Sequence, residues 1–243
     1  MTLLVSLRGK DGIVAAADSR GTFGDPRGVT AQNDSQQKLH LVSAHASVSL
    51  AGSGELGTML LTEIGERATK EKRDGATSIT ELVRVTARQR YGEWFPHLPP
   101  AAAPGTNAIG RPDLALQVTG YDPDASGEYT VPRLYSTNSA LDFPPMLHQY
   151  GFALTGVAQY ALYLLNRLYE PDRSLKDLVA LAVYVITETA SQDGKVGGPV
   201  RVVTLEPGTG IGRPLPDDEV KAIHDSNEER AASLRKSFYT STK

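Results

Sequence analysis

Residues 2–20 read TLLVSLRGKDGIVAAADSR, and this stretch decides the fold. Residues 2–8 are apolar and partly β-branched, which predicts a strand. The GKDG sequence at 9–12 has the turn residues of a tight hairpin, and the short apolar run at 13–17 predicts a buried returning strand. The chain therefore opens on two antiparallel strands, and the second of them ends at the charged Asp18.

A second hairpin pattern follows the first. Residues 38–42 and 46–50 each alternate between apolar and polar side chains, which predicts two strands. The sequence AGSG at 51–54 then ends the strand and opens a helix. Between the two hairpins, residues 21–37 are rich in Gly, Asp, Pro, Asn and Ser, and they predict an irregular loop.

The rest of the chain alternates between pairs of helices and strands. For the second helix, Ser78 is the predicted N-cap and Glu81 completes a capping box. Residues 96–112 are rich in Pro, Ala and Gly and predict a loop. The other predicted elements are helices at about 55–72, 79–94, 157–169 and 174–191, strands at about 114–121, 129–135 and 200–205, and a polar C-terminal helix at about 217–239.

This order of elements predicts the fold class. Hairpins rather than β-α-β crossovers connect the early strands, so we expect an α+β fold in which helices cover antiparallel sheets. A chain of 243 residues is short enough for one domain, and we expect a single domain over 1–243. The apolar helical stretches near 162–168 and 178–185 are expected to provide either core or subunit contacts.

Composition excludes several classes of function. The absence of cysteine excludes a disulfide framework, thiol catalysis and a Cys-ligated metal. A net charge of −3 gives no electrostatic reason to expect nucleic acid or an anionic membrane as a partner. Since no membrane span and no secretory signal are evident, we expect a cytoplasmic protein. His40, His45 and His97 lack metal-ligand spacing, so we expect no metal and no cofactor.

Thr2 is the first candidate for a catalytic group. It follows Met1, and removal of Met1 by an aminopeptidase would make Thr2 the N-terminal residue. An α-amino group has a pKa of roughly 7.7–8.0, so one residue could then carry both a hydroxyl nucleophile and its base. Many proteins begin Met-Thr without catalytic meaning, and the dipeptide alone decides nothing.

The residues that follow Thr2 give it a context. Asp18 follows the first hairpin, Lys38 opens the second, AGSG at 51–54 precedes a helix, and DGKVGG at 193–198 follows a later helix. In this order and spacing the chain resembles the β-type subunits of the proteasome family, within the N-terminal nucleophile hydrolases, and it resembles their bacterial homologues more than eukaryotic subunits. The resemblance implies a four-layer α-β-β-α sandwich of two antiparallel sheets covered by helices.

The resemblance also implies catalytic roles. Thr2 Oγ would attack a carbonyl carbon while its own amine shuttles the proton. Lys38 would lower the pKa of that hydroxyl, and Asp18 would hold Lys38 in place. The backbone N–H of Gly52 would donate into an oxyanion hole, and Asp193 would support the Thr2 amine.

The resemblance implies substrate contacts as well. Backbone groups of Thr22 and Gly54 would pair with an extended substrate as added strand partners, and Arg20 is grouped with them as a substrate-binding residue. The implied substrate is a peptide or an unfolded protein. Family members assemble into rings, so the implied assembly is a homo-oligomeric ring with its sites facing a chamber. Whether an ATPase is a partner stays open.

Each of these residues also has a simpler interpretation. Asp18 and Arg20 could form a surface ion pair at a strand end, and Lys38 could be a solvated strand lysine. The glycines at 52 and 54 could serve a strand-to-helix turn, and Asp193 could belong to a helix-end turn. These interpretations explain the residues one at a time, but they do not explain their joint occurrence.

The chain departs from the family at two positions. Active members carry serines near the nucleophile where this chain has Val157 and Val196. A valine cannot relay a proton or orient an amine by hydrogen bonding. Ser191 or a water molecule could substitute for them.

Three functions are therefore considered. The first is a threonine-type peptidase that cleaves peptide bonds with Thr2. The second is an amidase or transpeptidase of the same superfamily that acts on a specific amide. The third is a catalytically silent ring subunit, which the two valines favour.

Overall fold

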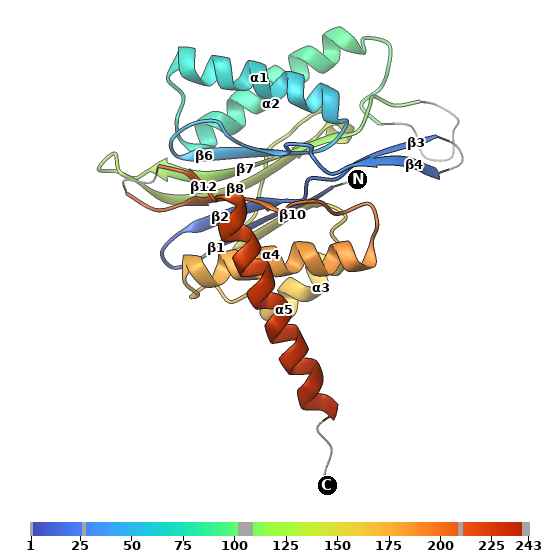
Figure 1. Cartoon of the computed structure of the whole chain (residues 1–243). Helices are drawn as coiled ribbons and strands as arrows, with labels where there is room; N and C mark the ends of the chain where they lie inside the picture. Colours follow the sequence, from blue (N-terminus) through green and yellow to red (C-terminus); the bar gives the residue numbers. More distant parts are fainter. Residues whose placement is uncertain (1, 26–27, 102–108, 209–210, 240–243) are drawn as a thin grey trace.

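The structure is a computed structural model that describes residues 2–25, 28–101, 109–208 and 211–239. It has four layers, in which two stacked sheets lie between two layers of helices (Figure 1). All neighbouring strands in both sheets are antiparallel. The predicted α+β sandwich is confirmed.

The first sheet has the strand order β10-β1-β2-β11-β12, and helices α3, α4 and α5 lie on its outer side (Figure 1). Its hairpin β1–β2 is the one that residues 2–20 predict. The bounds of these elements are β1 Leu3–Arg8, β2 Ile13–Ala17, β10 Phe152–Gly156, β11 Arg201–Leu205, β12 Arg213–Pro214, α3 Gln159–Leu168, α4 Leu175–Gln192 and α5 Asp217–Tyr239.

The second sheet has the strand order β5-β6-β7-β8-β9, and helices α1 and α2 cover its outer face (Figure 1). A short 3₁₀ helix, η1 (Ser139–Leu141), follows β8. The bounds of the other elements are β5 Leu39–Leu41, β6 Ala46–Gly52, β7 Leu114–Pro123, β8 Tyr129–Asn138, β9 Met146–Leu147, α1 Gly54–Glu71 and α2 Ala76–Trp94.

Strand β1 shows how the layers are held together. Side chains alternate between the two faces of a strand. Leu3, Val5 and Leu7 accordingly pack against α3 and α4, while Leu4 joins the core between the two sheets. Ser6 also faces the second sheet, where its Oγ lies 2.6 Å from the hydroxyl oxygen of Thr119. One strand thus contributes to two cores and to a polar contact between the sheets.

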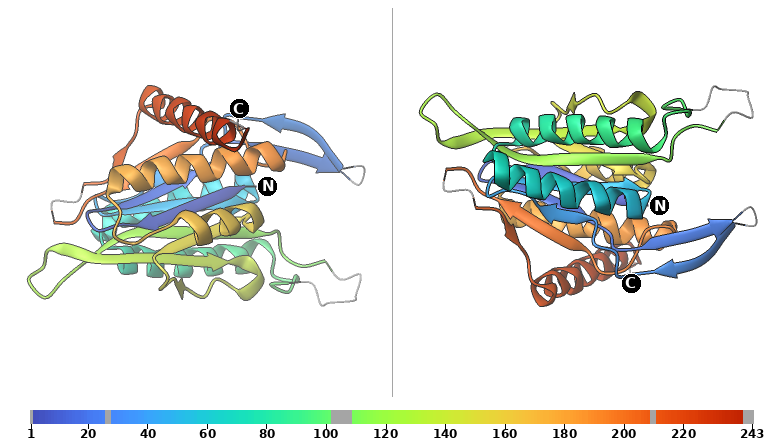
Figure 2. Two further views of the ribbon diagram at one scale, coloured as in Figure 1. Left: turned by 90° about the horizontal axis from the view of Figure 1, so that it is seen from below. Right: turned by 90° about the horizontal axis from the view of Figure 1, so that it is seen from above.

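The segment 21–37 is not an irregular loop, as its composition predicted. It contains a hairpin of β3 (Gly21–Asp25) and β4 (Gly28–Asn33), which extends beyond one side of the sandwich (Figure 2). Among the described residues these two strands pair only with each other. A hairpin that projects from the body needs no buried face, so its sequence carries no apolar alternation to reveal it.

The start of α2 also differs from the prediction. The helix begins at Ala76 with Gly75 as its N-cap, so Ser78 lies inside the helix. The cap comes from a distant strand instead, since the Oδ1 atom of Asp122 on β7 accepts a hydrogen bond of 2.8 Å from the Thr77 amide. A donor at a helix start can be satisfied from elsewhere in the fold, which local sequence does not show.

The C-terminal helix has the bounds that the sequence predicted, and its distal half extends away from the sandwich (Figure 1). The proximal half is anchored by Val220 and by Asn227, whose Nδ2 donates to the Ala180 carbonyl at 2.9 Å. Within the described ranges, no helix is long and apolar enough to cross a membrane. The predicted loop at 96–112 lies partly outside the described residues.

Candidate functional site

Thr2 lies immediately before β1, buried at one end of the sandwich. Its carbonyl accepts a hydrogen bond of 2.8 Å from the Val157 amide. This contact requires glycine at position 156. The φ of Gly156 is +92°, and any other residue would place its Cβ atom 1.8 Å from the Thr2 carbonyl oxygen. Met1 lies outside the described residues, so its removal stays a prediction.

Asp18 lies directly after β2 and is fully buried. Its Oδ1 accepts hydrogen bonds from the Leu3 amide at 3.0 Å and from Lys38 Nζ at 2.9 Å. Its Oδ2 accepts hydrogen bonds from the amides of Arg20 at 3.2 Å and Gly197 at 3.1 Å. Both carboxylate oxygens are therefore satisfied by protein donors although the side chain has no contact with solvent. The interpretation of Asp18 as part of a surface ion pair is therefore wrong.

Lys38 is fully buried, so it is not a solvated strand lysine. Its ammonium group forms an ion pair with Asp18 and also donates to the Arg20 carbonyl at 2.6 Å. Burial lowers the pKa of Lys38 below its ordinary value, because a charged group loses hydration there, and the negative charge of Asp18 acts in the opposite direction. The result is a cation that is held in one position inside the protein.

Gly52 ends β6 with a φ of +106°, and a Cβ atom there would lie 2.3 Å from the Asp113 carbonyl oxygen. The position therefore requires glycine for structural reasons alone. The next amide, of Ser53, donates to Asp113 on the β7 side at 2.8 Å. Because amide directions alternate along an antiparallel strand, the N–H of Gly52 points away from β7.

Thr2 and Gly52 meet at a pocket of about 550 Å³. The pocket lies between the β3–β4 hairpin and the junction of β6 with α1. Asp18 and Lys38 are not part of its lining. The lining residues include Thr2, Arg20, Thr22, Gly52 and Gly54 from the sequence prediction, together with Gly21, Phe23, Asn33, Ser35, Gln36, Ser53, Glu55 and Thr58.

The Arg20 side chain forms contacts that hold two segments of the chain together. Its guanidinium group forms two hydrogen bonds of 2.7 Å to the carboxylate of Asp34 and one of 3.1 Å to the Gly194 carbonyl. The guanidinium group lowers the pKa of Asp34. The pair joins the start of β3 to the segment after β4, so Arg20 shapes the pocket wall with its charge already balanced.

Asp193 does not line the pocket. It is the C-cap residue of α4, and its side chain accepts a hydrogen bond of 2.9 Å from the Lys195 amide. Its helix-end turn does serve the site, because the turn carries Gly197, whose amide binds Asp18. A supporting role of Asp193 toward the Thr2 amine stays a prediction.

The two valines are core residues. Val196 is fully buried in the cluster between the first sheet and its helices, and Val157 packs against the same cluster. The Ser191 hydroxyl donates a hydrogen bond of 2.7 Å to the Glu188 carbonyl within its own helix. Its proton is therefore already used in a contact inside α4.

Sequence reasoning missed the pocket residues at the end of β4 and directly after it, which are Asn33, Ser35 and Gln36. The only signal was that these polar residues precede Lys38 directly, and a polar segment is equally typical of a loop.

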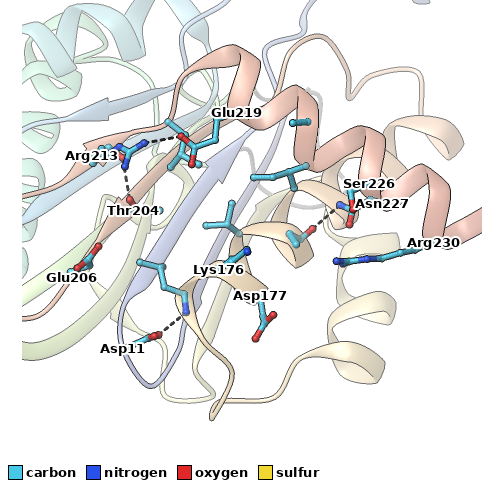
Figure 3. Close-up of a pocket in the computed structure, with 16 residues that line it drawn as sticks. Asp11, Lys176, Asp177, Thr204, Glu206, Arg213, Glu219, Ser226, Asn227 and Arg230 are labelled. Carbon is cyan, nitrogen blue, oxygen red and sulfur yellow. Dashed lines mark hydrogen bonds and ion pairs between the residues drawn. The ribbon is translucent and has the colours of Figure 1, made fainter.

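A larger pocket of about 760 Å³ lies elsewhere, between α4, α5 and β11 (Figure 3). Its labelled side chains carry charges of both signs, and several hold the fold together. Arg213 pairs with Glu219, and Asp11 accepts a hydrogen bond from the Leu175 amide at 2.6 Å. Neither Thr2 nor the Asp18–Lys38 pair belongs to this pocket. In the described part of the chain, no cluster of three His, Asp or Glu side chains could hold a metal.

No family model matches the chain. In sequence it is similar to Proteasome subunit beta 2 of Pyrococcus furiosus, with 27% identity over 210 residues that cover 84% of this chain and 86% of the relative. In structure it is similar to Anbu from Hyphomicrobium sp. strain MC1, solved as a Gly-1 mutant, with a TM-score of 0.69 and 16% identity over 100% of this chain and 99% of that one.

The fold is that of the proteasome-like N-terminal nucleophile hydrolases. Anbu from Yersinia bercovieri, described as an ancestral beta-subunit, has a TM-score of 0.69 and 16% identity, with coverage of 99% of this chain and 98% of that one. Anbu from Pseudomonas aeruginosa, solved as a helical assembly, has a TM-score of 0.68 and 18% identity over 99% of this chain and 97% of that one. At these identities the structural likeness shows the fold alone.

Proposed function

We propose that the protein is a proteasome β-type threonine peptidase, which cleaves peptide bonds with Thr2 as the nucleophile once Met1 is removed. The observation that carries the proposal is the buried Asp18–Lys38 ion pair beside a pocket that Thr2 lines. Burying two charges costs several kcal/mol per ion unless their surroundings compensate, and ionisable groups are often buried in this way at functional sites.

The proposed reaction has two steps. Thr2 Oγ attacks the carbonyl carbon and its proton passes to the α-amine, while the Gly52 N–H stabilises the oxyanion. The peptide C–N bond then breaks, and the leaving amine takes that proton. Water hydrolyses the resulting ester on Thr2 in the second step, with the α-amine again accepting and returning the proton. Lys38 supports both attacks electrostatically by favouring the deprotonated oxygen.

Intact mass with and without a peptide epoxyketone tests the proposal. We expect the mass of the chain without Met1, and a single added probe after incubation, since the probe requires both the free amine and the hydroxyl. A Thr2→Ala sample is the control and should gain no mass. Retained Met1, or processed protein that neither reacts with the probe nor cleaves any peptide of a diverse set, would contradict the proposal.

A catalytically silent subunit is the second candidate. Val157 and Val196 favour it, because both positions offer only apolar groups packed into the core. The same mass measurement separates the two candidates.

We further propose that the chain forms a homo-oligomeric ring. Helix α3 is predicted to provide either core or subunit contacts. Its Ala161 and Leu165 are buried in the core, while Leu162, Tyr163 and Leu168 are 45%, 60% and 46% exposed. Exposed apolar side chains that cluster on one surface favour contact with another protein.

Leu162→Asp is expected to lower the mass of the assembly toward that of the monomer, because it places a charge in the apolar contact. Light scattering coupled to gel filtration measures the mass. Thr62→Asp is the matched control, since it adds the same charge to an exposed position of α1 on the opposite layer. An unchanged mass for Leu162→Asp would exclude α3 as the contact.

A further inference from the structure

The side chain of Gln36 lies across the pocket that Thr2 lines. A Cβ atom built on Gly54 would be 2.0 Å from Gln36 Nε2, and one built on Gly21 would be 3.1 Å from Gln36 Oε1. The Gln36 amide N–H donates to the Ser19 carbonyl at 3.0 Å, which anchors the backbone. The carboxamide therefore touches both walls of the pocket, at the start of β3 and at the start of α1.

The Gln36 carboxamide also lies directly against the start of α1. Gly54 is the first residue of α1. Its φ is not among the positive ones, so the backbone does not require glycine here. The space that a side chain would fill is occupied by Gln36 instead.

The carboxamide has hydrogen-bonding capacity to offer. None of the hydrogen bonds between described residues uses the side chain of Gln36. Polar side chains stand near it in the lining, among them Ser53, Thr58 and Asn33. The one large apolar side chain there, Phe23, is 51% exposed.

One charged side chain of the lining, the exposed Glu55 in the first turn of α1, is a carboxylate, which disfavours an acidic group in the pocket. The guanidinium group of Arg20 is paired with Asp34. The charges of Lys38 and Asp18 compensate each other, and neither residue lines the pocket. A group that donates hydrogen bonds to the Gln36 carboxamide oxygen and the polar lining therefore matches this part of the pocket better than a bulky apolar group does.

We propose that Gln36 determines specificity: it forms a subsite that selects a polar side chain able to donate a hydrogen bond, of the carboxamide or hydroxyl type, on the residue whose carbonyl Thr2 attacks. This inference rests on the proposed function, because it needs Thr2 to attack an amide. A bulky apolar side chain would have to displace the carboxamide and leave it without a hydrogen-bonding partner, which disfavours such substrates.

Matched fluorogenic peptides test the inference. They differ only in the residue before the scissile bond, which is Gln in one and Leu in the other. We expect the wild-type protein to prefer the Gln peptide by about tenfold or more in kcat/KM, and Gln36→Leu to remove or reverse this preference, since leucine fills similar space without hydrogen bonding. The control is Gln37→Leu, the same change at the exposed neighbouring position, which does not line this pocket and should keep the wild-type ratio.

The two proposals fail in different ways. Turnover that depends on Thr2 but has the same ratio in Gln36→Leu as in the wild-type protein would overturn the role of Gln36 and leave the proposed function intact. Absence of turnover in every variant would count against the proposed function instead. The role of Gln36 is then decided by the dissociation constants of the two peptides on Thr2→Ala protein. A ratio that shifts with Gln36→Leu supports the role, and an unchanged ratio overturns it.

Discussion

Thr2→Ala is expected to abolish peptide hydrolysis, with a loss of about 10⁴-fold or more in kcat/KM, because no other group can form the covalent ester. The fold should persist, since the contact that holds this end of the chain uses the backbone carbonyl, which alanine retains. Steady-state kinetics and thermal unfolding of the same sample measure the two effects.

Thr2→Ser is the matched control for this prediction. Serine keeps the hydroxyl and the adjacent amine, and it also permits removal of Met1, so substantial turnover should remain. If Thr2→Ala kept wild-type turnover after confirmed loss of Met1, the activity would belong to another group, and the proposed nucleophile would be wrong.

Lys38→Met is expected to have the largest effect on stability. It leaves the fully buried carboxylate of Asp18 without its cationic partner, and breaking a buried ion pair from one side costs about 3–5 kcal/mol. Peptide hydrolysis should be lost as well, because the cation that favours the deprotonated hydroxyl is gone. Urea unfolding and kcat/KM are the measurements.

A double variant separates structure from catalysis. Asp18→Asn combined with Lys38→Met removes both charges, so much of the lost stability should return while hydrolysis stays absent. Arg84→Met breaks an exposed pair with Glu81 and should change stability by less than about 1 kcal/mol. A double variant that regained full hydrolysis would reduce the buried pair to a structural role.

The sequence predicted the elements that carry periodic or spaced signals. The opening hairpin, the paired helices and the order of Thr2, Asp18 and Lys38 are all local patterns or regular spacings. The structure brings Lys38 to Asp18 and lines the pocket with Thr2, Gly52 and Gly54. The catalytic roles of these residues stay predictions that the experiments above address.

The pocket wall around Gln36 and the cap on α2 depend on contacts that the spacing of residues along the chain does not encode. The Arg20–Asp34 pair joins two parts of a polar segment without periodicity, and Gln36 is placed by the turn that this pair holds. The cap on α2 comes from Asp122, 45 residues from Thr77 along the chain. The Asp122 contact forms only once α2 has packed on its sheet, and the Arg20–Asp34 contact lies in a segment whose composition predicted an irregular loop.

The late position of the turn after α4 in the chain determines when the site can be completed during synthesis. Gly197 supplies one of the donors to Asp18, and its carbonyl accepts from the Ser19 amide, yet it is made 179 residues after Asp18. A ribosome builds the chain from the N-terminus, so most of the protein must emerge before the carboxylate has its full set of donors. A nascent chain therefore carries Thr2 long before the surroundings of that residue are complete, and this delay would keep a protease inactive until its fold is finished.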